Sequence, residues 1–106
     1  MKTLVCLCVF VFGIVCIVLA DDRAMHSYVP PAGLVPDAQT AIRIAEAVWL
    51  PIYGKETIQN EKPFIAILQD DVWKVTGSIP KGLHGGVALA EISRRDGCII
   101  RVSHGK

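Results

Sequence analysis

Histidine and cysteine are the residues of this sequence whose side chains most readily bind a metal ion or attack a substrate. Beyond residue 20 they are His26, His84, Cys98 and His104. Structural zinc sites use ligands at short, regular spacings, and no pair among these four has such a spacing. The sequence therefore predicts no metal site, and we expect no cofactor.

The patterns of common catalytic sites are also missing. Serine, histidine and aspartate all occur, but the nucleophile-elbow pattern Gly-x-Ser-x-Gly does not. Gly85-Gly86 lacks the Lys-Ser or Lys-Thr that follows in a phosphate-binding loop. An isomerase-like site needs a carboxylate and a phenol in one apolar cavity, for which Glu91 and Tyr53 are the candidates. Nothing in the sequence brings those two side chains together, so we predict no catalytic residue.

Cys98 has two interpretations. A reactive thiol needs an exposed, electropositive setting, and Arg94 and Arg95 are near it in sequence. Alternatively, Cys98 is a small apolar residue at the start of an alternating strand, in phase with Ile100 and Val102. We expect the second, a buried and reduced thiol.

The first twenty residues have the features of a secretory signal peptide. Lys2 supplies a positive charge, residues 4–20 are uncharged and mostly apolar, and the acidic pair Asp21-Asp22 follows. We expect cleavage after Ala20 and a periplasmic mature protein. The alternative is an uncleaved inner-membrane anchor, because the apolar run approaches the ~17 to 25 residues that span a bilayer.

Removal of residues 1–20 would leave a chain of balanced charge. Ten Lys and Arg residues would face ten Asp and Glu residues, and Cys98 would be the one remaining cysteine. A net charge near zero gives no electrostatic reason to bind nucleic acid or an anionic membrane surface. A single cysteine cannot form an internal disulfide, so the stability of the domain must come from its core.

We expect two parts after the signal peptide, an extended arm or linker over residues 21–34 and a single domain over residues 35–106. The arm contains Pro30-Pro31 and Gly33 and has neither helical nor strand periodicity. A chain of 106 residues is long enough for one small domain and too short for two.

The principal element of this domain is a helix within residues 35–54. Asp37 can cap its first turn. Pro51 should end or kink the regular helix near Leu50, and Gly54 can cap the chain after one further turn. One broad apolar arc should face the core. It comprises Ala38, Ala41, Ile42, Ile44, Ala45, Val48, Trp49 and Ile52.

Four strand-like segments follow the helix and predict an antiparallel meander. Trp73, Val75 and Ile79 alternate with polar residues, which places one face of the second strand in the core and the other in water. Asp70-Asp71 and Asp96-Gly97 predict tight hairpin turns. The expected class is α+β, with one main N-terminal helix packed on a curved four-stranded antiparallel sheet. The strands are expected over residues 64–69, 72–79, 87–94 and 98–104, after a polar loop over residues 55–63, with a glycine-rich loop over residues 80–86.

Short motifs occur in a distinctive order along these elements. They are Ala41-Ile42-x-Ile44-Ala45-Glu46-Ala47, Pro51-Ile52-Tyr53-Gly54, Lys62-Pro63-Phe64, Val72-Trp73-x-Val75-x-Gly77, Gly85-Gly86, Asp96-Gly97 and Val102-Ser103-His104-Gly105-Lys106. In this order they resemble a bacterial immunity family with the nuclear-transport-factor-two (NTF2) fold, found beside polymorphic toxins. The resemblance implies a cystatin-like, cone-shaped roll of helix on sheet. It also implies a non-enzymatic protein that binds and neutralises a cognate toxin.

The loop over residues 80–86 is our hypothesis for the toxin-binding surface, with Lys81, Leu83 and His84 as its contacts. Loops held by a rigid sheet commonly carry recognition, and an apolar residue between polar ones can serve as an anchor. The outer faces of the third and fourth strands, around Arg94 and Arg101, are the alternative surface.

Other functions and partners stay open at this stage. The same broad fold could serve as a small-ligand-binding or isomerase-like domain, and an extracytoplasmic protease inhibitor is a third hypothesis. The expected partner is a toxin protein, with no nucleic acid and no membrane after signal cleavage, and a homodimer is compatible with the sequence.

Overall fold

The computed structural model describes residues 27–80 and 83–105, so the expected signal peptide over residues 1–20 lies outside the described residues. Within this part of the chain, no helix is both long and apolar enough to cross a membrane. The elements are two helices, α2 (Ala38–Tyr53) and α3 (Lys55–Gln59), followed by the strands β1 (Ile65–Gln69), β2 (Val72–Thr76), β3 (Ala88–Ser93) and β4 (Ile99–His104).

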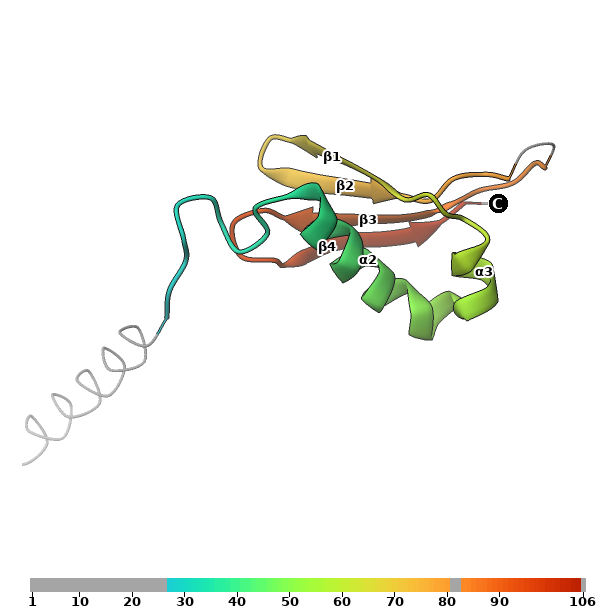
Figure 1. The fold of residues 1–106 in the computed structure, drawn as a ribbon, viewed down its shortest axis with the longest axis horizontal. Coiled ribbons are helices and arrows are strands. Elements are labelled where there is room, and N and C mark those ends of the chain that lie inside the picture. The colour runs from blue at the N-terminus through green and yellow to red at the C-terminus, as the bar shows by residue number, and fades with distance from the viewer. Residues whose placement is uncertain (1–26, 81–82, 106) are drawn as a thin grey trace, which may run out of the picture.

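The four strands form one antiparallel sheet in the order β1-β2-β3-β4. Helix α2 lies across one face of this sheet, and α3 follows it near the end where β3 begins and β4 ends (Figure 1). The expected α+β class, one main helix on a four-stranded antiparallel meander, is confirmed. We call the helix-covered side of the sheet the core face and the opposite side the outer face.

Helix α2 begins where its sequence predicts. The Asp37 carboxylate accepts a hydrogen bond of 2.8 Å from the Thr40 backbone N–H, which satisfies a donor that the first turn would otherwise leave free. Ala41, Ala45 and Trp49 recur at every fourth residue and are fully buried. Ala41 and Ala45 contribute small side chains to this stripe, and Trp49 is the largest fully buried side chain among the described residues.

The C-terminal end of α2 corrects one expectation. Of the two outcomes expected at Pro51, an end or a kink of the helix, the first is wrong, since the helix runs through Pro51 to Tyr53. Proline costs the helix one backbone hydrogen bond, and the bonds of the neighbouring residues hold the following turn. Gly54, with φ 90°, then donates its N–H to the Leu50 carbonyl at 2.9 Å and caps the helix as predicted. Ile52 was expected in the core arc but is 58% exposed.

The segment after α2 was expected to be a loop, and this is wrong. Residues Lys55–Gln59 form the short helix α3, and Ile58 within it is fully buried. The Ile58 backbone N–H bonds the Gly54 carbonyl, which continues the helical pattern past the cap. A single apolar residue among polar ones shows no periodicity, so the sequence pattern could not reveal this helix.

The core face of the sheet agrees with the alternation of β2. Trp73 and Val75 are buried, and the Trp73 indole N–H donates to the Val35 carbonyl at 2.8 Å. Across the ladder, Trp73 pairs with Ile92, which is also fully buried. Ile79 lies beyond the end of β2 and is 48% exposed, so its expected place on the core face is wrong.

The two predicted hairpin turns are confirmed. Asp70 and Asp71 join β1 to β2 with φ values of 52° and 62°, the left-handed conformation that aspartate tolerates. Gly97, with φ 73°, lies in the turn between β3 and β4.

Cys98 is exposed, which contradicts the expected buried thiol. Strand β4 begins only at Ile99, and Cys98 still belongs to the turn, where its backbone N–H bonds the Asp96 carboxylate at 2.9 Å. The residue that seemed to start an alternating strand is therefore part of the hairpin connection.

A register shift breaks the expected alternation of β4. Ile92 pairs with Ile99 and Glu91 pairs with Arg101, so Ile100 has no opposite residue on β3. An extra residue of this kind is a β-bulge, and it changes which face the following side chains occupy. The phase counted from Cys98 therefore does not hold across the strand.

The last residues of the expected arm belong to the domain. The backbone N–H groups of Leu34 and Val35 donate to the carbonyls of Arg95 and Arg94, each at 2.9 Å, and Val35 is 1% exposed. A Cβ on Gly33 would lie 2.4 Å from the Arg94 carbonyl oxygen, and its φ is 86°, so both the contact and the backbone require glycine here.

Trp73→Ala should lower the free energy of unfolding by roughly 3 to 5 kcal/mol, because it leaves a large cavity in the core and removes the bond to Val35. Trp73→Phe is the matched variant, since it keeps an aromatic ring and loses the indole N–H. It should cost only ~1 to 2 kcal/mol. Urea denaturation followed by fluorescence of Trp49 measures both, and equal costs for the two variants would contradict the packing described here.

Candidate functional site

Glu61 is the buried charged residue around which the chemically active side chains gather. It is 6% exposed and lies in the turn between α3 and β1. Its Oε1 accepts a hydrogen bond of 2.7 Å from the Ala88 backbone N–H, and its own carbonyl accepts one of 2.7 Å from Ser78. A Cβ on Gly77 would lie 2.5 Å from Oε1, so glycine leaves the space that the carboxylate occupies.

His104, near the end of β4, completes this group of side chains. Its Nε2 lies 2.9 Å from the second carboxylate oxygen of Glu61, and its Nδ1 lies 2.8 Å from the Gly105 carbonyl oxygen. Both neighbours are acceptors, so the imidazolium form, with two N–H donors, satisfies both bonds at once. The Tyr53 ring lies against His104, with ring centroids 5.0 Å apart. We call Glu61, His104 and Tyr53 the Glu61 cluster.

The Glu61 cluster has the residue types of an acid–base site but not the free atoms of one. A general base needs an unoccupied ring nitrogen within reach of a substrate proton. Both nitrogens of His104 are already hydrogen-bonded within the protein. Glu61 divides its oxygens between Ala88 and His104. The arrangement is therefore suited to joining β3, β4 and the turn before β1.

The pair considered for an isomerase-like site is not brought together. Tyr53 contacts His104 on the core face, where His104 pairs with the buried Ala88. Glu91 lies between the buried Ala90 and Ile92 on β3 and so projects from the outer face. Because the sheet separates them, Tyr53 and Glu91 cannot act on one substrate.

The outer face carries a row of side chains across all four strands. Ile67 pairs with Lys74, Lys74 with Glu91, and Glu91 with Arg101. The Arg101 guanidinium lies 3.5 Å from the Glu91 carboxylate, and its side chain is 60% exposed. Ile67 is 61% exposed. We call these four residues the outer row, which presents an apolar end followed by positive, negative and positive charges.

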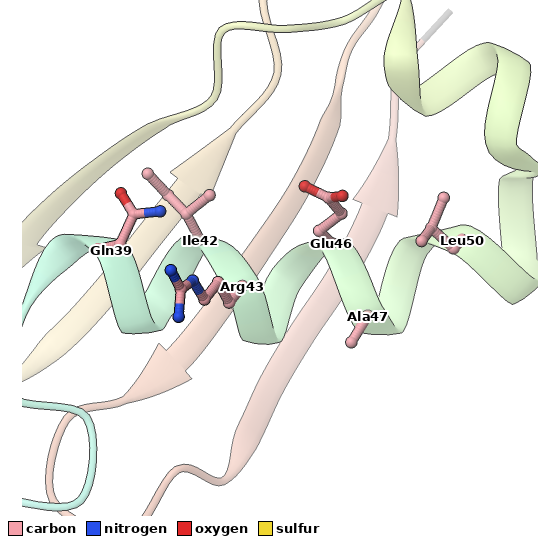
Figure 2. Close-up of a pocket in the computed structure, with 6 residues that line it drawn as sticks. All are labelled: Gln39, Ile42, Arg43, Glu46, Ala47 and Leu50. Carbon is pink, nitrogen blue, oxygen red and sulfur yellow. The ribbon is translucent and has the colours of Figure 1, made fainter.

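The surface of the described residues includes two open depressions. One, of about 380 Å³, runs along the exposed side of α2, and Figure 2 shows that its lining side chains all come from that helix. The other, of about 310 Å³, lies beside the outer row and is lined by Gln69, Asp70, Val72, Lys74 and Glu91. The lining of the first comes from α2 alone, and that of the second comes from the strands and the turn between β1 and β2.

The residues predicted to bind a toxin occupy separate places. Leu83, 63% exposed, and His84 lie on the loop at the end of the sheet where β3 begins, and Lys81 lies outside the described residues. Arg94 is at the other end of β3, where it bonds the Asp71 carboxylate at 3.0 Å and the Ala32 carbonyl.

Arg101 belongs to the outer row, between the two ends of the sheet. Sequence reasoning missed the other members of that row and the role of Glu61. The alternation of β2 had placed Lys74 on the wet face, which was the available signal for it. Glu61 stood in a polar stretch with no signal of burial.

The stability of the protein should decrease as pH rises through the neutral range. The hydrogen bond with Glu61 raises the pKa of His104 above its ordinary value of 6.5; burial opposes this, and the Gly105 carbonyl adds to it. The folded protein thus holds a proton that the unfolded chain releases, so the stabilisation is complete below about pH 6.5 and is lost above the raised pKa.

Urea midpoints at about pH 6 and about pH 8.5 measure this slope. Glu61→Gln removes the negative charge beside His104 and should flatten the slope, whereas His84→Ala, on the exposed loop, should retain it. An unchanged slope in Glu61→Gln would contradict the assignment to His104.

Comparison with known proteins identifies the family. Residues 40–106, which include most of α2 and the whole sheet, match the family Imm-NTF2-2, described as NTF2 fold immunity protein. Over 67 residues the chain is 34% identical to the uncharacterized protein YbbC of Escherichia coli (strain K12), a match covering 62% of this chain and 55% of that protein. Over 74 residues it is 34% identical to the uncharacterized protein YhhH of the same strain, covering 69% of this chain and 58% of that protein.

The chain thus spans a little over half the length of these two relatives. No solved structure gives a significant match. The family match nevertheless covers every strand of the sheet and agrees with the helix-on-sheet fold. The chain belongs to the family of NTF2-fold immunity proteins.

Proposed function

We propose that this protein is an exported immunity protein that binds and neutralises a cognate toxin without catalysis. The observation that carries the proposal is the family match over residues 40–106. An immunity role follows from the family, and direct binding of a toxin protein is the step that we add.

The chemistry of the surface supports a binding role. A protein that blocks a toxin needs complementary shape and charge, and it needs no catalytic group. The outer row offers charges of both signs beside an exposed isoleucine, Ile67, on a face that no helix described in the structure covers (Figure 1). Charges spaced in this way can select one partner and repel others.

We place the toxin contacts on the loop over residues 80–86 and on the adjoining outer face. Leu83 is exposed at the loop, with His84 beside it and Lys81 two residues before it. Arg101, on the outer face of the sheet, is a separate proposed contact. Arg94 is bonded internally at the other end of β3, so it is tested separately.

A combined Lys81→Ala, Leu83→Ala and His84→Ala variant should lose ~2 kcal/mol or more of binding free energy to the toxin encoded beside this gene. Its melting temperature should not change, because Leu83 and His84 are exposed. Ile52→Ala is the matched control, since Ile52 is 58% exposed on α2, and it should bind like wild type.

Isothermal titration calorimetry measures these affinities, and single Arg101→Ala and Arg94→Ala variants accompany them. Unchanged affinity in the triple variant would remove the loop from the interface. A loss confined to Arg101→Ala would then place the contacts on the outer face.

We also propose that the protein is exported and cleaved after Ala20, with a periplasmic mature form. The charged, apolar and acidic segments in residues 1–22 support this. Intact-mass spectrometry of the protein from a periplasmic extract should give the mass of residues 21–106. A mass that retains residues 1–20, in the membrane fraction, would favour an anchor instead.

A further inference from the structure

Strand β1 forms one edge of the sheet. It pairs with β2 on one side, and no strand among residues 27–80 and 83–105 pairs with its other side. The outward backbone N–H and C=O groups of an edge strand can accept another strand. The segment Ile65–Gln69 therefore has unused pairing capacity.

The sequence of β1 lacks the features that normally protect an edge. It reads IAILQ, with no charged residue and no proline, and Ile65, Ile67 and Leu68 are 50%, 61% and 43% exposed. The opposite edge, β4, carries Arg101 and a bulge in its ladder, both of which discourage pairing. Of the two edges, β1 is therefore the one whose composition favours pairing with another strand.

We propose that β1 pairs antiparallel with β1 of a second copy of this chain, about a two-fold axis at Ile67. A two-fold axis makes the contact self-complementary, and it closes after two subunits. With the axis at the central residue of the strand, all five residues of each β1 find a partner. Ile67 then lies opposite itself, and Ile65 lies opposite Gln69.

The charges that flank β1 favour this antiparallel arrangement. Lys62 precedes the strand, and its Nζ lies 5.9 Å from the centre of the Phe64 ring. Phe64 would lie opposite Asp70 of the second copy, so each Lys62 ammonium comes near an aspartate of its partner. A parallel arrangement would instead place Lys62 beside Lys62 and Asp70 beside Asp70, which is repulsive.

The outer row is compatible with the paired sheet. Ile67 is its apolar end, and Lys74 is the next residue along the row. Pairing would join the two rows through two isoleucines, with the lysines kept apart on either side. An apolar centre with a charged rim is the usual composition of a specific interface.

Cysteine cross-linking tests the proposed register in a full chain whose four native cysteines are replaced by serine. Directly opposite residues in an antiparallel ladder have Cα atoms about 4.5 to 5.5 Å apart, within the range of a disulfide. Ile67→Cys should therefore form a disulfide-linked dimer under mild oxidation. Ile65 is also apolar and exposed, so Ile65→Cys is the matched control. The two copies of residue 65 would lie roughly 14 Å apart, and the Ile65→Cys variant should remain monomeric on a non-reducing gel.

Sedimentation velocity of the chain with its native cysteines tests whether Lys62 and Asp70 stabilise the dimer. Wild type should form a dimer, and Lys62→Glu should weaken it at least about tenfold, because glutamate would face Asp70. Adding Asp70→Asn to Lys62→Glu should recover part of the lost dimerisation, because asparagine tolerates the left-handed conformation of residue 70 and removes the like charge. Ile52→Lys, at an exposed site on α2, should leave dimerisation unchanged. Circular dichroism confirms that each variant is folded.

A monomeric wild type at all concentrations would overturn the proposal. So would efficient cross-linking at Ile65 without cross-linking at Ile67, or a Lys62→Glu and Asp70→Asn double variant no better than Lys62→Glu alone. Since these measurements use no toxin, their failure is distinguishable from failure of the proposed function.

Discussion

The burial of the Glu61 carboxylate is the constraint on which the rest of this structure depends. Removing a charge from water costs several kcal/mol unless partners replace the water. Here the partners come from distant segments, the Ala88 N–H at the start of β3 and the His104 imidazole at the end of β4. Gly77 must lack a side chain for the carboxylate to fit. The Glu61 carboxylate thus requires the end of β2, the start of β3 and the end of β4 to lie close together.

The burial of Glu61 also gives the core face of the sheet a structural role that the outer face does not have. Because His104 gives both ring nitrogens to internal bonds, the titratable group of the core face serves the fold. The helix covers the same face, and the Trp49 and Trp73 indoles bond backbone carbonyls there. On the outer face, by contrast, Glu91 and Arg101 lie 3.5 Å apart, and the Arg101 side chain is 60% exposed. The function proposed above, binding by an immunity protein, needs only such an exposed polar surface.

Local patterns predicted the elements whose signals lie within a few residues. The Asp37 cap, the Asp70-Asp71 turn and the alternation around Trp73 each follow from neighbouring residues, and together they gave the correct class and strand order. What they missed depends on distant contacts. Nothing near Glu61 indicates that Ala88 and His104 will surround it, and the bulge that leaves Ile100 unpaired arises from the pairing of β4 with β3. The family resemblance supplied the function class, which no local pattern contained.

The small size of the domain helps to explain why the edge strand β1 is left exposed. A small domain buries a modest fraction of its surface. Among residues 27–80 and 83–105, no helix covers the outer face and no strand pairs with the outer side of β1. The single cysteine outside the expected signal peptide, Cys98, is exposed and can form no internal cross-link. The apolar, uncharged sequence of β1 is readily explained if a second strand covers it, because an exposed edge of that composition would otherwise favour indiscriminate pairing.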